Sequence, residues 1–155
     1  MTSPSSRRSK AARLTGNVKA SLEGNMISSL YAAILALLIV WLSLQVIKLR
    51  RAKKVRLGDG GEPELQIAIR AQGNAIEYVP ISLILLVLLE LNGAHAILVH
   101  SGGIAVLAGR LLHARGLLTE SLHYRVLGMK VTIFSLIGLA LSNIAYALYN
   151  GLRAL

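Results

Sequence analysis

Two long stretches without a charged residue constrain this sequence more than any other feature. Met26 to Ile47 spans 22 such positions, and Val131 to Leu152 spans another 22. A helix needs about 20 predominantly apolar residues to cross the hydrocarbon core of a bilayer. Only 15% of all residues are charged, whereas a soluble globular domain has about 25%. The sequence therefore predicts an integral membrane protein.

Two apolar segments that contain more polar residues lie between these stretches. Val79 to Leu89 is largely apolar, and Asn92 to Gly109 has no Asp, Glu, Lys or Arg over 18 positions. The turn-forming sequences Gly-Asp-Gly-Gly at 58–61 and Asn92-Gly93 indicate short connections. We expect an all-α membrane protein, an up-down bundle of four transmembrane helices. The predicted spans are 26–48, 65–91, 95–115 and 124–150.

The chain is nevertheless strongly basic, with 17 Lys and Arg against 7 Asp and Glu and a net charge of +10. Most of these cations flank the predicted spans. The first loop holds Lys48, Arg50, Arg51, Lys53, Lys54 and Arg56, and the third loop with its helix ends holds Arg110, Arg115, Arg125 and Lys130. Because Lys and Arg favour the cytoplasmic side, we expect both loops to face the cytoplasm. The charge is thus mostly an orientation signal, and we expect no nucleic-acid partner.

Residues 1–25 form a second basic segment. They are rich in serine, contain no aromatic residue and lack hydrophobic periodicity, which predicts a disordered basic extension ahead of a membrane domain at 26–155. Their cations conflict with the orientation that the loops predict. The alternatives are a secretory signal that continues into the first span, or a natural start at Met26 with a non-native extension before it.

Three polar residues interrupt the second predicted span at helical spacing. Arg70, Asn74 and Glu77 stand at i, i+4 and i+7 and therefore share one face. An ionisable side chain within a membrane costs about 2.5–3.5 kcal/mol on insertion scales, so such residues are candidates for function. The structural alternative is an Arg–Glu pair that locks two helices together, with Asn74 bonding between helices.

A second group of cations lies at about the same depth. Arg110 and His113, at i and i+3 of the third span, share a face, and Arg125 begins the fourth span. An arginine near a helix end can also reach the interface without binding anything. Since the combined set has several cations and one acid, we expect an anionic ligand. His95 and His100 stand at i and i+5, which is poor spacing for a metal site, and the chain has no cysteine. We expect no metal.

The sequence from Arg70 to Pro80, RAQGNAIEYVP, resembles the second-helix signature of the MAPEG family (membrane-associated proteins in eicosanoid and glutathione metabolism). Gly109 to His113, GRLLH, resembles the family's third-helix element, and the resemblance to the short bacterial branch covers about residues 26–155. It implies a homotrimer in the bacterial inner membrane, in contact with lipids, with glutathione bound between neighbouring subunits near the cytoplasmic face.

The resemblance also implies roles for individual residues. Glutathione-binding positions would be Arg70, Asn74, Glu77, Tyr78, Arg110 and His113, and the catalytic position would be Arg125. A guanidinium near the glutathione sulfur favours the thiolate, the nucleophilic form of the thiol. The implied activity is a glutathione transferase or peroxidase acting on hydrophobic electrophiles that arrive from the bilayer.

The sequence departs from the family pattern at three positions. Leu117 and Met129 stand where some members have tyrosines, and Gly73 stands where one branch has an extra arginine. A catalytically weak or inactive member of the family is therefore one alternative. A small multidrug-type exporter with Glu77 as a proton-coupled carboxylate is another, although such a site should have few cations near its carboxylate.

Overall fold

The structure is a computed structural model that describes residues 26–154, and the extension predicted for residues 1–25 lies outside that range. Four helices make up the described chain: α2 (Ile27–Lys53), α3 (Pro63–Leu91), α4 (Ala96–Leu118) and α5 (Leu122–Ala154). All four are long and apolar enough to cross a membrane. The predicted all-α membrane fold is confirmed.

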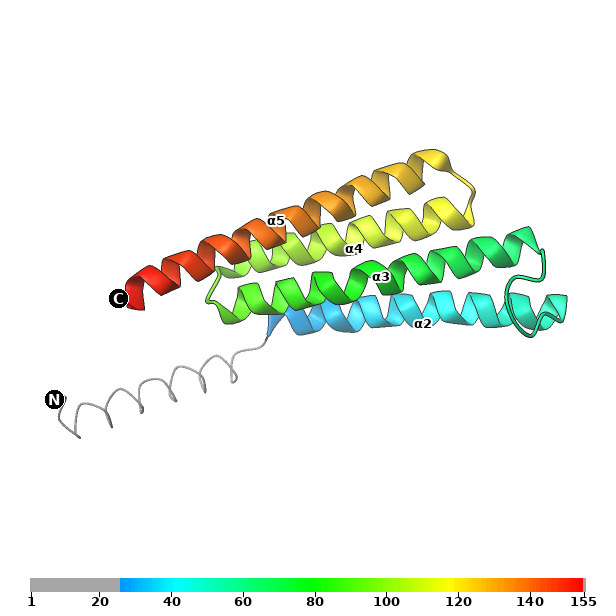
Figure 1. The fold of residues 1–155 in the computed structure, drawn as a ribbon, viewed down its shortest axis with the longest axis horizontal. Coiled ribbons are helices and arrows are strands. Elements are labelled where there is room, and N and C mark those ends of the chain that lie inside the picture. Colours follow the sequence, from blue (N-terminus) through cyan, green and yellow to red (C-terminus); the bar gives the residue numbers. More distant parts are fainter. Residues whose placement is uncertain (1–25, 155) are drawn as a thin grey trace, which may run out of the picture.

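The helices are joined by short connections and therefore alternate in direction (Figure 1). Loops 54–62 and 119–121 lie at one end of the bundle, and loop 92–95 lies at the other. We call the former the basic end, because the cations of the first and third loops gather there. The two loops that the charge pattern assigns to the cytoplasm thus lie at the same end of the bundle.

Each observed helix differs from its predicted span by a few residues. The first continues five residues beyond 48, since a helix does not have to stop where the hydrocarbon region stops. It ends at Lys53, and the capping residue Lys54 takes the left-handed conformation and donates its N–H to helix carbonyls. The next helix starts at Pro63, a favoured residue for a first helical position, and stays helical through Pro80.

The bundle buries a core of aliphatic side chains from α2, α3 and α4. Its members include Leu35, Leu42, Leu86, Leu89, Val99 and Val106, all of them essentially inaccessible to solvent. Large apolar side chains also point away from the bundle, among them Leu37, Phe134 and Leu148. An outward apolar surface of this kind is expected of helices that contact lipid.

Glu90, near the end of α3, binds the start of α2 at the end of the bundle opposite the basic end. Its Oε1 accepts a hydrogen bond from the N–H of Ile27 at 2.6 Å, and its Oε2 accepts one from the N–H of Ser28 at 2.9 Å. A carboxylate near the end of a predicted span is expected to be solvated. Glu90 instead caps the first turn of α2, where helix N–H groups have no partner within the helix.

Glu90→Ala should lower the free energy of unfolding by about 1–2 kcal/mol, because two N–H groups lose a charged acceptor. Denaturation of the detergent-solubilised protein measures this change. Glu64→Ala is the matched control, since within residues 26–154 the Glu64 carboxylate forms only an exposed ion pair with Lys53, and such pairs contribute about 0–1 kcal/mol. Equal losses in the two variants would contradict the capping role.

Candidate functional site

A cleft of about 270 Å³ opens near the basic end, between α3, α4 and α5. Its lining consists of Arg70, Asn74, His113, Leu117, Arg125, Val126 and Met129. A second cleft of about 260 Å³ adjoins it and shares Leu117 and Arg125 with it. Four of the seven predicted site residues thus line one cavity, and they come from three different helices.

Arg110 lies beneath this cleft rather than in its lining. Only 2% of its surface is exposed. Its Nη1 donates to Asn74 Oδ1 at 2.6 Å, and its Nε and Nη2 donate to Thr132 Oγ1 at 3.0 and 2.6 Å. Its guanidinium carbon also lies 5.1 Å from the centre of the Tyr78 ring, in cation–π geometry. Arg110 therefore orients Asn74 and joins three helices.

No carboxylate neutralises this buried guanidinium within residues 26–154, whose ion pairs involve only Lys53, Glu62 and Glu64. All the hydrogen-bond acceptors of Arg110 are neutral oxygens. A buried charge without a counterion is costly. The interior next to the cleft is thus electropositive and favours an anion.

His113 connects α4 to the start of α5. The side chain is buried, and its Nδ1 lies 3.0 Å from the carbonyl oxygen of Arg125. This bond fixes the backbone at Arg125, whose own side chain is exposed and faces the cleft. A buried imidazole therefore positions the predicted catalytic arginine.

Glu77 and Arg70 lie on the open side of the site. Both side chains are exposed in the single chain, and Glu77 does not line either cleft. The described part of the chain contains no Arg70–Glu77 ion pair, so the alternative in which that pair locks the helices has no support here. The space beside Gly73 is also open, with no atom within 4 Å of a Cβ built there.

Three small residues that the sequence reasoning passed over bring the site together. A Cβ on Gly116 would collide with the backbone of Arg125, and one on Gly128 would collide with the backbone of His113. The backbones of α4 and α5 therefore touch, which places His113 against Arg125. Thr132 follows Gly128 by one turn. Small residues four apart are a common feature of packed membrane helices, and this spacing is the signal that could have identified them.

Gly128→Ala should destabilise the protein by about 2 kcal/mol, because the added methyl group forces two backbones apart. It should also weaken ligand binding, since His113 and Arg125 would separate. Gly138→Ala on the same helix is the control: its Cβ meets nothing, so the better helix propensity of alanine should leave stability unchanged or raised by up to about 1 kcal/mol. A thermal unfolding series in detergent compares them, and equal melting temperatures would contradict the close packing.

The arrangement defines a class of protein: a four-helix membrane protein with a cationic cleft near one membrane face. Over residues 28–145 the sequence matches the MAPEG family. Relatives described as "Inner membrane protein YecN", from two strains of Escherichia coli, are 45% identical over 121 residues, covering 78% of this chain and 92% of the relative. The chain belongs to the MAPEG family, and the apolar helices together with these relatives indicate an integral inner membrane protein.

Proposed function

We propose that this protein is a membrane-bound glutathione-dependent transferase, with peroxidase activity as an extension, that acts on hydrophobic electrophiles. The observation that carries the proposal is the cleft lined by Arg70, Asn74, His113 and Arg125 above an uncompensated, buried Arg110. Glutathione has two carboxylates and one amino group, and guanidinium groups bind carboxylates through paired hydrogen bonds.

The spacing along α3 suits a tripeptide. Glu77 follows Arg70 by seven positions, which is about 10 Å along a helix, and three extended residues span about 10 Å. A glutathione molecule lying along α3 would place a carboxylate at Arg70 and its amino group at Glu77, with Asn74 between them. Arg110 and Tyr78 would support this face from below.

The open side of the site favours contact with a neighbouring subunit, and we propose that this assembly is a homotrimer. Glu77 stands near the middle of a membrane-spanning helix and is exposed in the single chain. A carboxylate at this depth is normally covered by protein or faces a water-filled cavity. A neighbouring subunit that packs against α3 would supply this cover and would close the glutathione cleft. Because basic loops favour the cytoplasm, the site would open to the cytoplasm.

Arg125 is the residue we assign to catalysis. A cysteine thiol has a pKa of about 8.5 and is mostly protonated at neutral pH. A guanidinium beside the sulfur lowers that pKa and increases the fraction of thiolate. The thiolate then attacks the electrophilic carbon of the substrate and forms a carbon–sulfur bond, while the leaving group departs with the bond electrons. Leu117, Val126 and Met129 supply an apolar wall for a substrate from the bilayer.

One observation favours a second candidate, a family member that binds glutathione but turns it over slowly. The side chains that line the first cleft include no hydroxyl group. Stabilisation of the thiolate would then depend on Arg125 without a hydrogen bond from a tyrosine. The two candidates share the binding site and differ only in rate.

Turnover in proteoliposomes tests the proposed activity. Purified protein would be supplied with glutathione and an aryl halide that partitions into lipid, and formation of the thioether would be followed by absorbance. We expect a rate above that of protein-free liposomes, with saturation in glutathione. Binding of glutathione without any excess rate would favour the second candidate, and absence of both would refute the proposal.

A further inference from the structure

A third cleft, of about 560 Å³, lies on the basic end where α2 ends and loop 54–62 begins. Its lining consists of Ile47, Arg50, Arg51, Lys54, Val55 and Arg56. Four of these six residues are cations and none is an acid. None of them lines the glutathione clefts, so this is a separate site.

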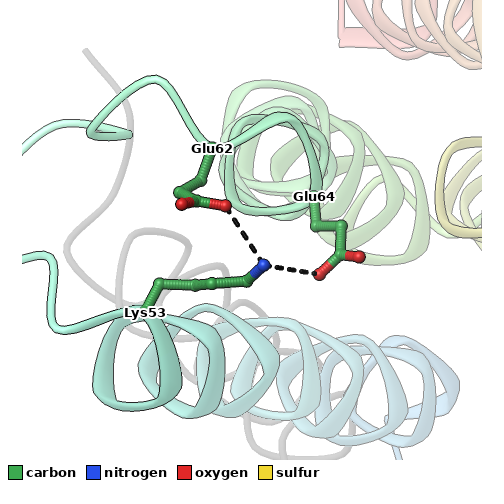
Figure 2. A network of polar contacts seen from close by, with 3 residues as sticks. All are labelled: Lys53, Glu62 and Glu64. Atoms are coloured by element: carbon green, nitrogen blue, oxygen red, sulfur yellow. Dashed lines mark ion pairs between the residues drawn. The ribbon is translucent and has the colours of Figure 1, made fainter.

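The acids of the following loop have other partners. Figure 2 shows Lys53 pointing toward Glu62 and Glu64, with its Nζ 3.1 and 3.6 Å from their carboxylate oxygens. Asp59 accepts a hydrogen bond from the N–H of Gly61 at 3.0 Å. Within residues 26–154 these acids therefore neutralise Lys53, the last residue of α2, which does not line the cleft.

The cleft has a fixed backbone. Arg50 Nη1 donates to the carbonyl of Gly58 at 2.8 Å, and the N–H of Val55 donates to the carbonyl of Arg50 at 3.0 Å. The Val55 side chain also packs against Gly60. The Arg50 side chain thus stabilises the loop through its hydrogen bond to Gly58. In contrast, Arg51, Lys54 and Arg56 form no ion pair within residues 26–154.

We propose that this cleft binds the phosphate of an anionic phospholipid headgroup in the membrane leaflet on the basic end. Arg51, Lys54 and Arg56 supply the positive charge. Ile47 links the cleft to the exposed apolar surface of α2, which includes Leu44 and Ile47 and offers a path for an acyl chain. This continuity with a lipid-facing surface identifies a lipid rather than a free anion as the ligand. Basic clusters beside a membrane helix commonly attract anionic lipids.

The orientation rule alone does not require this geometry. Positive loops on the cytoplasmic side need only a sufficient number of Lys and Arg residues near the helix end. Here Lys53 is paired away from the cleft and Arg50 holds the loop backbone. Arg51, Lys54 and Arg56 remain for a ligand. If the cleft is a specific lipid site, the affinity for lipid depends on which cations are removed. If the cations serve orientation alone, that affinity depends only on how many are removed.

The test compares two double variants that each remove two positive charges from the basic end. Arg51→Gln/Lys54→Gln removes charge from the cleft, and Arg115→Gln/Lys130→Gln removes it elsewhere; neither Arg115 nor Lys130 lines this cleft. Delipidated protein in detergent would be titrated with phosphatidylglycerol or with phosphatidylcholine of the same acyl chains, and bound lipid would be counted by native mass spectrometry. Inorganic phosphate at millimolar concentration would serve as the competitor.

We expect phosphatidylglycerol to bind about tenfold more tightly than phosphatidylcholine, and the cleft variant to lose about 10- to 30-fold of that affinity. The control variant should stay within about twofold of the wild type, and phosphate should not displace the lipid. Equal affinity for the two lipids, equal losses in the two variants, or displacement by phosphate would each overturn the proposal.

Discussion

Arg125→Ala should abolish the thiolate absorbance of bound glutathione and lower the rate of conjugation by about 100- to 1,000-fold. Losses of this size follow the removal of one preorganised group that stabilises developing negative charge. Glutathione should still bind, because Arg70, Asn74 and Arg110 remain in place. The expected signature is therefore a large fall in kcat with a smaller change in glutathione affinity. Single-turnover kinetics with ultraviolet detection of the thiolate measure both quantities.

Arg115→Ala is the matched control for this experiment. Arg115 is also exposed at the basic end, its guanidinium carbon lies 5.3 Å from the centre of the Tyr124 ring, and it lines neither of the two clefts to which Arg125 contributes. Its removal should leave the thiolate signal and the rate within about twofold of the wild type. If Arg115→Ala reduced the rate as much as Arg125→Ala, general positive charge rather than Arg125 would account for the activity.

Thr132→Val should lower the free energy of unfolding by about 3 kcal/mol. Thr132 is fully buried, and its hydroxyl oxygen accepts bonds from both Nε and Nη2 of Arg110. Valine has nearly the same shape but leaves two charged N–H donors without an acceptor, and a hydrogen bond to a charged group contributes about 1.5–3 kcal/mol. Denaturant titration in a mild detergent measures the change. Because Arg110 also holds Asn74, glutathione binding should weaken as well.

Thr132→Ser separates the hydroxyl from the methyl group. Serine keeps the acceptor for Arg110 and the donor for the carbonyl of Gly128, so its cost should be about 1 kcal/mol, for the lost methyl alone. If the serine and valine variants were equally destabilised, the contribution of Thr132 would be packing, and the proposed support of Arg110 would be wrong.

The sequence was sufficient to predict the four helices, because the feature that defines them is local. A charge-free stretch such as Met26 to Ile47 has few alternatives to a membrane helix, and turn residues such as Asn92 and Gly93 mark where the chain reverses. The helix ends were less predictable. The first helix continues to Lys53, since a cation ends the apolar stretch without ending the helix.

The residues of the candidate site were predictable where a polar side chain is costly in a membrane. Arg70, Asn74, His113 and Arg125 were identifiable from their polarity, and the fold places them around one cleft. The sequence could not distinguish a residue that lines the cleft from one that supports it. Arg110 is an equally polar residue on α4, the helix of His113, yet it lies beneath the cleft. That difference depends on the crossing of α4 and α5.

The residues that set this crossing are small or weakly polar, so they do not stand out in the sequence. Gly116 and Gly128 matter because of the backbone that faces them, and Thr132 matters because its hydroxyl bonds the Arg110 side chain. One sequence gives no direct sign of these partners. Glu90 shows the same limit for a charged residue. Its role as a cap requires α2 and α3 to meet at the end opposite the basic end.

The most direct test of the central claim is equilibrium binding of glutathione to the detergent-solubilised protein, with heat and proton release recorded together. We predict saturable binding at or below millimolar concentration, accompanied by release of a proton as the thiol becomes a thiolate. Glu77→Gln should weaken this binding, since the carboxylate assigned to the amino group would be lost. A wild-type protein that binds no glutathione at millimolar concentration would contradict the account.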